Sequence, residues 1–288
     1  MKKHCNDEAR RLLEGIEEAE AIVVGAGSGL STSAGFVYSG ERFERYFADF
    51  IEEYGFTDMY SAGFYPFETP EERWAYWSRY IWYNRYVSTP KDTYKKLLKL
   101  LEGKNYFVLT TNVDHQFQRV GFPKERLFYT QGDYGLWQCS VPCHARTYDN
   151  YETVKLMMEE QRDMRVPSEL VPRCPKCGTE MSMNLRADNS FVEDVGWHEA
   201  ARRYRNFTEA NSRGKVLYLE LGVGMNTPVI IKYPFWQNIL ANSQATYACI
   251  NYGEAYAPAQ IKDRSILINV DIDAVLSELL EMADHKEA

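Results

Sequence analysis

Five short apolar runs lie among more polar segments of the chain, at residues 21–29, 106–112, 216–224, 246–252 and 265–271. Runs of this length are typical of strands that are buried on both faces of a parallel sheet. Amphipathic helical patterns lie beside or between them, at residues 6–20, 90–103 and 271–285. Strands that alternate with helices predict an α/β fold with a doubly wound parallel sheet.

Two stretches interrupt this alternation. Residues 36–88 have no strand signal and hold most of the aromatic side chains, and a capping box of Thr69 and Glu72 opens a helix within them. Aromatic-rich helices are more often core than binding surface, so we expect 36–88 to be a helical insertion that covers the sheet. Residues 132–185 contain two close cysteine pairs and are expected to form a small domain. The main domain would then consist of residues 1–35, 89–131 and 186–288.

Charge and hydropathy exclude some classes of protein. The net charge of −8 argues against a general binder of nucleic acid or anionic membrane. No apolar run is long enough to span a bilayer, and the first residues, MKKHCNDEARRLLEG, lack the apolar core of an export signal. We therefore expect a soluble, cytoplasmic protein in which disulfide bonds are not favoured.

Four of the six cysteines form two pairs, Cys139 with Cys143 and Cys174 with Cys177. Pairs of thiolates at this spacing are typical of a tetrahedral zinc site. Four buried thiols that meet by chance are the alternative, which RCPKCG disfavours because it predicts a tight turn with both sulfurs on one side. Four cysteines leave no open coordination position, so the predicted zinc is structural. His144 is expected to support the cluster or lie exposed rather than to bind the metal.

The first apolar run leads into VVGAGSGLSTSAG, which carries Gly25, Gly27 and Gly29. Glycines at such a turn let backbone N–H groups approach a pyrophosphate, and the helix N-terminus that follows favours negative charge. The pattern departs from G-x-G-x-x-G at Leu30, and no second strand ends in an acidic residue about 20 positions on. The loop therefore indicates a dinucleotide but not hydride transfer, with a ligand-free glycine turn as the alternative.

GAG, STSAG, TTNVD, the cysteine pairs and GVGMNTP occur in this order, and over residues 20–275 the chain resembles the sirtuins. The resemblance implies a Rossmann-like NAD-binding domain, a smaller domain made of a zinc ribbon and a helical insertion, and NAD that is consumed as a substrate. It assigns Asp114 to the nicotinamide carboxamide and Asn112 to the ribose and a water molecule. It also implies a diphosphate site at Gly25, Ala26, Gly27 and Ser28, and an adenosine side at Gly222, Gly224, Asn226 and Asn251.

Several positions depart from the usual sirtuin pattern. Thr111 stands where the family has glutamine, and GFVYSGERF replaces GIPDFR, which leaves the role of Arg42 open. The catalytic His–Gly dipeptide corresponds to Gln131–Gly132. These departures resemble the class M sirtuins, a microbial group linked to macrodomain proteins. That resemblance implies ADP-ribosylation of a protein acceptor, a lipoyl carrier similar to the glycine-cleavage H protein, and a macrodomain partner that removes ADP-ribose.

Gln131 decides which reaction we expect. Deacylation needs a base that activates a ribose hydroxyl, whereas cleavage of the nicotinamide–ribose bond needs orientation and charge stabilisation. Histidine suits the role of base, but glutamine only donates and accepts hydrogen bonds. We therefore predict an NAD-dependent mono-ADP-ribosyltransferase with Asn112, Asp114 and Gln131 as catalytic residues, in which Gln131 positions the ribose.

Two other functions remain open. One is an NAD-dependent lysine deacylase with an unrecognised base, for which His115 is the nearest candidate, although a structural role at a helix start is favoured. The other is a non-catalytic sensor of NAD or ADP-ribose. TTNVD disfavours a sensor, because a sensor does not need the nicotinamide-side Asp114.

Overall fold

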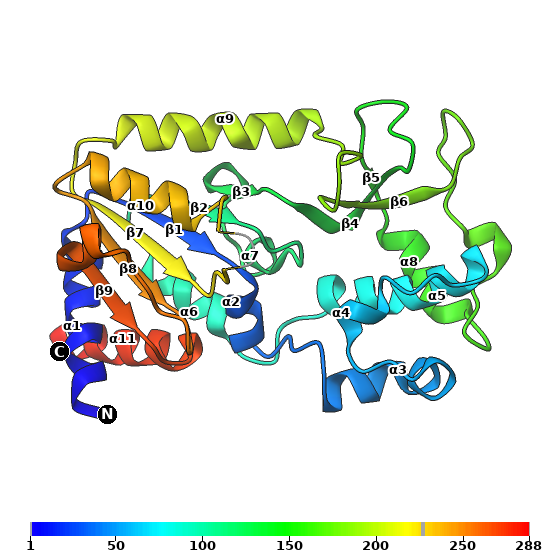
Figure 1. Ribbon diagram of the computed structural model, residues 1–288, viewed down its shortest axis with the longest axis horizontal. Helices are drawn as coiled ribbons and strands as arrows, with labels where there is room; N and C mark the ends of the chain where they lie inside the picture. The colour runs from blue at the N-terminus through cyan, green and yellow to red at the C-terminus, as the bar shows by residue number, and fades with distance from the viewer. Residues whose placement is uncertain (1, 226–227, 288) are drawn as a thin grey trace.

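The structure is a computed structural model that describes residues 2–225 and 228–287. Its larger unit is built on a six-stranded parallel sheet with the order β3-β2-β1-β7-β8-β9 (Figure 1). The strands are β1 (Ala21–Ala26), β2 (Tyr106–Thr110), β3 (Leu127–Tyr129), β7 (Val216–Leu221), β8 (Thr246–Ile250) and β9 (Ser265–Ile268). Each of the five predicted apolar runs contains one of these strands, and β3 is an additional strand at the edge of the sheet.

Helices cover both faces of this sheet, as a doubly wound fold requires. Helices α9 and α10 lie above the sheet in the view of Figure 1, and α1, α6 and α11 lie below it. Each layer has its own core, one around Leu12, Leu97 and Leu276 and the other around Phe235 and Ala200. The helices of this unit are α1 (Lys2–Glu18), α2 (Ser28–Ser33), α6 (Thr93–Leu100), α7 (Gln116–Arg119), α9 (Val195–Ala210), α10 (Lys232–Ala241) and α11 (Ile272–Glu287), with short 3₁₀ turns η2 (Lys124–Arg126) and η4 (Ala259–Arg264). The α/β, Rossmann-like prediction is confirmed.

The smaller unit lies beyond the carboxyl ends of the strands (Figure 1). Its antiparallel sheet has the order β5-β4-β6 and consists of β5 (Tyr148–Asp149), β4 (Gly132–Cys139) and β6 (Met181–Leu185). The helices around it are α3 (Glu41–Tyr54), α4 (Met59–Ala62), α5 (Pro70–Ile81), the π-helical turn η1 (Trp82–Tyr86), α8 (Tyr151–Glu160) and the 3₁₀ turn η3 (Ser168–Leu170).

The aromatic insertion packs on the small sheet. Phe47, Trp74 and Tyr76 share one buried cluster with Trp137 on β4 and Met157 on α8. The expectation that residues 36–88 cover the large sheet is therefore wrong. The insertion packs elsewhere because helices of the larger unit already occupy both faces of the large sheet. The short strands of the small sheet, by contrast, need an apolar partner. The insertion and the zinc ribbon together form the smaller domain, as the resemblance implied.

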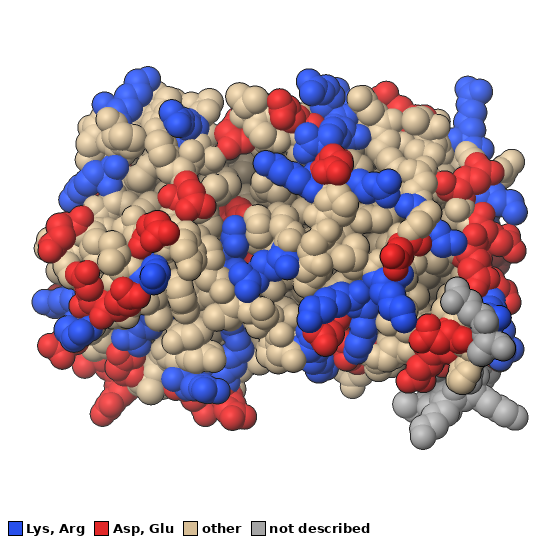
Figure 2. Space-filling model, turned by 180° about the vertical axis from the view of Figure 1, so that it is seen from behind, with Lys and Arg blue, Asp and Glu red and all other residues tan. Residues whose placement is uncertain are grey.

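Charged side chains of both signs are interspersed on the face of the molecule that Figure 2 shows. Of the helices within residues 2–225 and 228–287, none combines the length and the apolar character that a membrane span needs.

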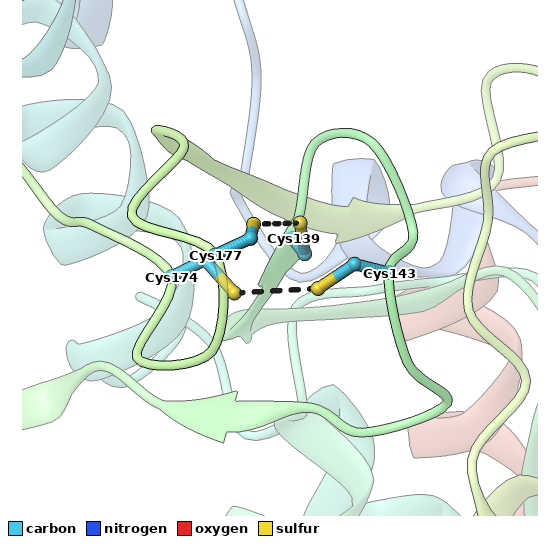
Figure 3. Close-up of side chains that lie close together, drawn as sticks. All are labelled: Cys139, Cys143, Cys174 and Cys177. Carbon is cyan, nitrogen blue, oxygen red and sulfur yellow. Dashed lines mark hydrogen bonds between the residues drawn. The ribbon is translucent and has the colours of Figure 1, made fainter.

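The four paired cysteines come together at the end of β4 (Figure 3). Their Sγ atoms all lie within 4.8 Å of one another, with Cys139 3.5 Å from Cys177 and Cys143 3.7 Å from Cys174. A tetrahedral zinc with Zn–S bonds of about 2.3 Å spaces its sulfurs about 3.8 Å apart. The cluster is therefore suited to structural zinc. His144 contacts Cys143 Sγ through Nδ1 at 3.0 Å, so it supports the cluster and does not belong to the four-ligand set.

We predict one zinc ion per chain in the purified protein, measured by elemental analysis. The Cys174→Ser variant should lose the metal and unfold at a lower temperature, because a structural zinc contributes folding free energy. Cys249→Ala is the matched control, since Cys249 is buried in β8 outside the cluster and its loss should leave the zinc in place. A metal content far below one ion per chain in the unmodified protein would contradict the assignment.

Candidate active site

The candidate site lies at the carboxyl edge of the large sheet, facing the smaller unit (Figure 1). Ligands of open α/β sheets bind at this edge. Strand β1 pairs with β2 on one side and β7 on the other, so the loops after these three strands are neighbours. The predicted site residues come from these loops, from the loop after β8 and from the start of β4.

Three glycines allow the loops after β1 and β7 to touch. A Cβ atom at Gly27 would lie 2.7 Å from the Gly222 carbonyl oxygen, and one at Gly29 would lie 2.7 Å from Gly222 Cα. Gly222 has φ of +62°, in the left-handed region that favours glycine. Side chains are therefore excluded where the two backbones meet.

The four residues predicted to hold the diphosphate differ in position. Gly25 and Ala26 belong to β1 itself, and a Cβ at Gly25 would lie 2.6 Å from Phe235 on α10. Packing of α10 against β1 thus explains this glycine. Gly27 is the N-cap of α2 and Ser28 is its first residue, with an exposed side chain.

Asn112 is a buried link between the loops after β1 and β2. Its Nδ2 donates to the Gly27 carbonyl oxygen at 3.0 Å and to Ser31 Oγ at 3.1 Å. Its backbone N–H is held by Thr110 Oγ1 at 3.0 Å. The amide is thereby fixed with its donor end directed into the protein.

Asp114 is buried two residues further along the same loop. One carboxylate oxygen accepts a 2.5 Å hydrogen bond from Ser31 Oγ, and the other accepts from the Gln116 N–H at 3.2 Å. Burial raises the pKa of Asp114 to about 6, against the lowering effect of these two hydrogen bonds. Buried carboxylates with raised pKa values are common at functional sites.

Ser31 and Tyr94 complete this cluster and were not predicted. Ser31 Oγ lies 2.8 Å from the Tyr94 hydroxyl, which also accepts from Asn112 Nδ2 at 3.3 Å. Both side chains are buried. Ser31 belongs to STSAG, the motif already used for the family resemblance, whereas Tyr94 has no signal in its local sequence.

The adenosine-side residues also converge on the sheet edge. Asn251, at the end of β8, donates from Nδ2 to the Val223 carbonyl oxygen at 3.1 Å and so ties the loop after β8 to the loop after β7. Gly224 follows directly and is half-buried. Asn226, which the resemblance placed here as well, lies outside the described residues.

Gln131 lies in the link from β3 to β4, and Gly132 is the first residue of β4. The Gln131 carbonyl oxygen accepts from the Arg186 N–H at 3.0 Å, and the Gln131 residue is partly exposed. Gly132 has φ of +96°, and a Cβ there would overlap the Asn184 carbonyl oxygen. Glycine is therefore required after Gln131, and the backbone at this position is closely held.

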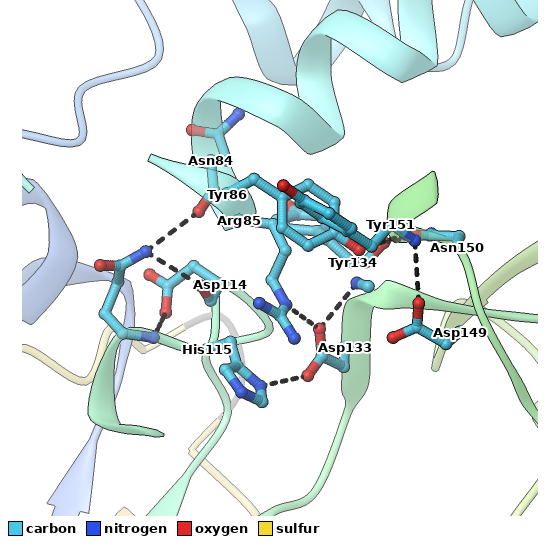
Figure 4. Close-up of polar contacts among 12 residues, drawn as sticks. Asn84, Arg85, Tyr86, Asp114, His115, Asp133, Tyr134, Asp149, Asn150 and Tyr151 are labelled. Carbon is cyan, nitrogen blue, oxygen red and sulfur yellow. Dashed lines mark hydrogen bonds and ion pairs between the residues drawn. The ribbon is translucent and has the colours of Figure 1, made fainter. Parts of the chain in front are cut away.

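His115 lies at the start of α7 with φ of +60°, which confirms the predicted helix-start position. Its Nδ1 donates to Asp133 Oδ2 at 2.5 Å, and Asp133 Oδ1 accepts from Arg85 Nε at 2.6 Å (Figure 4). Burial would raise the pKa of Asp133, but the His115 hydrogen bond and the Arg85 charge outweigh it and lower this pKa. Sequence reasoning missed both Arg85 and Asp133.

Arg42 anchors the aromatic insertion. Its guanidinium donates to the Tyr83 carbonyl oxygen at 2.6 Å and to Asn84 Oδ1 at 3.0 Å, and it lies 4.6 Å from the centre of the Phe36 ring. These contacts tie α3 to η1 and to the segment that follows α2.

Comparisons with known proteins agree with the motifs. No protein family model matches the chain. The chain is 41% identical over 274 residues to a protein ADP-ribosyltransferase of Staphylococcus aureus strain Mu50, covering 95% of this chain and 87% of the relative. It is 32% identical over 288 residues to a probable bifunctional ADP-ribose hydrolase/ADP-ribosyltransferase of Fusarium oxysporum f. sp. cubense, covering 93% of this chain but only 47%, about half, of that longer relative.

Solved structures of sirtuins share the fold. Sir2Tm bound to a propionylated peptide superimposes with a TM-score of 0.63 at 20% identity, over 96% of this chain and 98% of the other. A complex of Sir2 with p53 peptide and NAD⁺ gives a TM-score of 0.62 at 21% identity, over 95% and 98%. Identity over nearly the whole chain gives the family and superposition gives the fold: the chain belongs to the protein ADP-ribosyltransferase family and has the fold of the sirtuins.

Proposed function

We propose that the enzyme transfers single ADP-ribosyl groups at a site built around the buried cluster of Ser31, Asn112 and Asp114. The observation that carries this proposal is the buried carboxylate of Asp114. Its loop is hydrogen-bonded to β4, the strand that follows Gln131. The Tyr134 N–H donates to the Val113 carbonyl oxygen at 2.9 Å and makes that tie. Gln131 occupies the position of the base that deacylation needs.

In the proposed reaction, the bond between nicotinamide N1 and ribose C1′ breaks and its electron pair stays with nicotinamide, which leaves as a neutral molecule. A nucleophilic group of the acceptor bonds to C1′ and gives its proton to water. Asp114 accepts a hydrogen bond from the carboxamide N–H. Asn112, whose Nδ2 already donates within the protein, uses Oδ1 to accept from a ribose hydroxyl or a water molecule.

Gln131 holds the ribose hydroxyls in this proposal. A glutamine amide both donates and accepts hydrogen bonds but has no lone pair of useful basicity. It therefore orients the sugar without removing a proton. Diphosphate binding at Gly27 and Ser28, with Gly25 and Ala26 in the strand behind them, completes NAD binding together with the loops after β7 and β8.

The acceptor we propose is a lipoylated carrier protein similar to the glycine-cleavage H protein, with a macrodomain protein as the partner that removes ADP-ribose. The class M resemblance supports the carrier. The Fusarium relative supports the macrodomain partner's activity, because its name joins an ADP-ribose hydrolase and an ADP-ribosyltransferase in one chain.

We predict that labelled NAD will modify the lipoylated carrier and will modify the unlipoylated carrier much less. Mass spectrometry of the product should find a single ADP-ribosyl group and locate it. Equal modification of both carriers, or of neither, would contradict the proposed acceptor. Release of nicotinamide, followed in the same reaction, reports whether NAD is consumed without transfer.

Asp114 should be active only when it is ionised, because only then do both of its oxygens accept. Transfer should therefore fall as the pH drops through about 6, the raised pKa of this carboxyl. Asp114→Asn and Asn112→Ala should each lose about 100-fold or more in rate, since misplaced reactants carry penalties of this size. Exposed Asp188→Asn is the matched control and should keep full activity.

The unfolding temperature of Asp114→Asn shows whether Asp114 serves the reaction or only the fold. Because folding raises the pKa of Asp114 from an ordinary 3.8 to about 6, its ionised form destabilises the fold above pH 6 and not below pH 3.8. The difference corresponds to about 3 kcal/mol. Asp114→Asn should therefore unfold at the same or a higher temperature than the unmodified protein at pH 8. Unchanged transfer by Asp114→Asn and Asn112→Ala would end the site assignment.

The unmodified enzyme should deacetylate acetyl-lysine peptides poorly, because general-base catalysis typically contributes a factor of roughly 10² to 10⁴. Gln131→Ala should lower transfer, and Gln131→His should lower transfer while adding at most weak deacylation. Chromatographic detection of acyl-ADP-ribose measures the second reaction. Robust deacetylation by the unmodified chain would refute the role given to Gln131.

A further inference from the structure

One buried carboxylate joins three separate parts of the molecule. Asp133 on β4 accepts from Arg85 on η1 at 2.6 Å and from His115 at the start of α7 at 2.5 Å (Figure 4). Its Oδ1 also accepts from the Gly135 N–H at 2.7 Å. The Asp133 side chain is 5% exposed, Arg85 12% and His115 26%. The insertion, the small sheet and the NAD-binding unit therefore meet at a single side chain.

The backbone at His115 is held in an unusual conformation for this contact. Its φ of +60° lies in the left-handed region, which is uncommon for residues other than glycine, although asparagine, aspartate and histidine adopt it more often than the rest. Such strain persists only where the surroundings over-determine it, and it gathers at functional sites. The hydrogen bond to Asp133 accounts for a histidine at this position.

Gly135 makes room for the other partner. A Cβ atom there would lie 2.8 Å from Arg85 Nε and 2.9 Å from Arg85 Nη2. A side chain at this position would displace the guanidinium from its present place beside the carboxylate. Arg85 itself projects from a π-helical turn, a rare geometry that recurs at functional sites. The glycine at position 135 and the π-helical turn that carries Arg85 thus both favour the ion pair between Arg85 and Asp133.

The electrostatics require both partners. A buried carboxylate is unfavourable unless it is paired and hydrogen-bonded. Arg85 and His115 supply those partners, and the pKa of Asp133 falls below its usual value in spite of burial. Asp133 therefore stays ionised, and an uncharged residue at position 133 would leave the Arg85 guanidinium without its counter-charge.

The location of this group links the two loops of the proposed site. His115 directly follows Asp114, and Asp133 lies two residues after Gln131. The bond from Tyr134 N–H to the Val113 carbonyl oxygen lies beside it and joins the same two segments. Movement of β4 relative to the loop after β2 would change the separation of Asp114 and Gln131.

We propose that Arg85, His115 and Asp133 form an inter-domain clamp that sets the position of Gln131 relative to Asp114. Asp133 is then a positioning residue for ADP-ribosyl transfer, and it contacts neither NAD nor the acceptor. The clamp rests on the roles proposed above for Asp114 and Gln131. It predicts that loss of the clamp lowers kcat while NAD binding at the loops after β1, β7 and β8 is retained.

The first test uses Asp133→Asn and Arg85→Gln, with nicotinamide release and transfer both measured. We expect kcat to fall about 10- to 100-fold, as for a misplacement of about 1 Å, with KM for NAD changed by no more than about twofold. Arg79→Gln is the matched control, because Arg79 makes a similar pair with Asp49 at 2.6 Å inside the insertion. That variant should keep its kcat even where its unfolding temperature falls.

A second series separates positioning from folding. His115→Gly relieves the left-handed backbone but removes the donor, so it should keep its unfolding temperature and still lose kcat. His115→Asn should restore most of the activity, because asparagine tolerates this backbone and its amide donates to Asp133. Since asparagine is not a base, that rescue also excludes a general-base role for His115. Gly135→Ala should reproduce the loss seen in Arg85→Gln.

Unmodified kcat in Asp133→Asn and His115→Gly would overturn the clamp. So would losses in all variants that merely track the unfolded fraction at the assay temperature. Asp114→Asn, measured alongside, distinguishes the two proposals. Full activity in Asp114→Asn defeats the proposed function itself, whereas an inactive Asp114→Asn with a fully active Asp133→Asn defeats only the clamp.

Discussion

The candidate site is built around the Asp114 carboxylate, which is buried with only 7% of the residue exposed. The Ser31 hydroxyl and the Gln116 N–H replace part of the lost hydration, yet its pKa still rises to about 6. Ser31 is in turn fixed by Asn112 and Tyr94. The loops after β1 and β2 must therefore be in register before this hydrogen-bonded cluster can form, and the parallel pairing of these strands supplies that register. Under the proposed function, the stability lost by burying this carboxylate is the cost of holding it ready to accept a hydrogen bond.

The sequence predicted the large sheet well, because its central strands are buried on both faces and appear as unbroken apolar runs. It did not predict β3, whose three residues are too few for a pattern. Nor did it predict β4, GDYGLWQC, which has no polar alternation because most of its residues are buried. The aromatic richness of 36–88 indicated a core but not which sheet that core would cover. A hydrophobic pattern indicates that a face is buried, but it does not indicate which other element that face packs against.

The same limit applies to the site. Motifs located Asn112, Asp114 and Gln131, since each lies in a short segment with a family pattern. Tyr94 reaches Ser31 across 63 positions, and Arg85 reaches Asp133 across 48, so local patterns carry no trace of either contact. The left-handed backbone at His115 was equally hidden, because TTNVDHQ gives no sign that the residue after Asp114 leaves the usual conformation. These contacts come from tertiary packing.

Strand β4 runs from the proposed clamp to the cysteine cluster, and it would couple a bound metal to the candidate site. Cys139 ends the strand at the cysteine cluster, and Asp133 lies near its start in the clamp. Strands of two, eight and five residues cannot enclose a core by themselves, so the small sheet depends on the aromatic insertion and on the cysteine cluster for its shape. Zinc bound there would fix one end of β4 while Asp133 fixes the other. Under the proposed function, a metal that contacts no reactant would then act through geometry, by holding rigid the strand that follows Gln131.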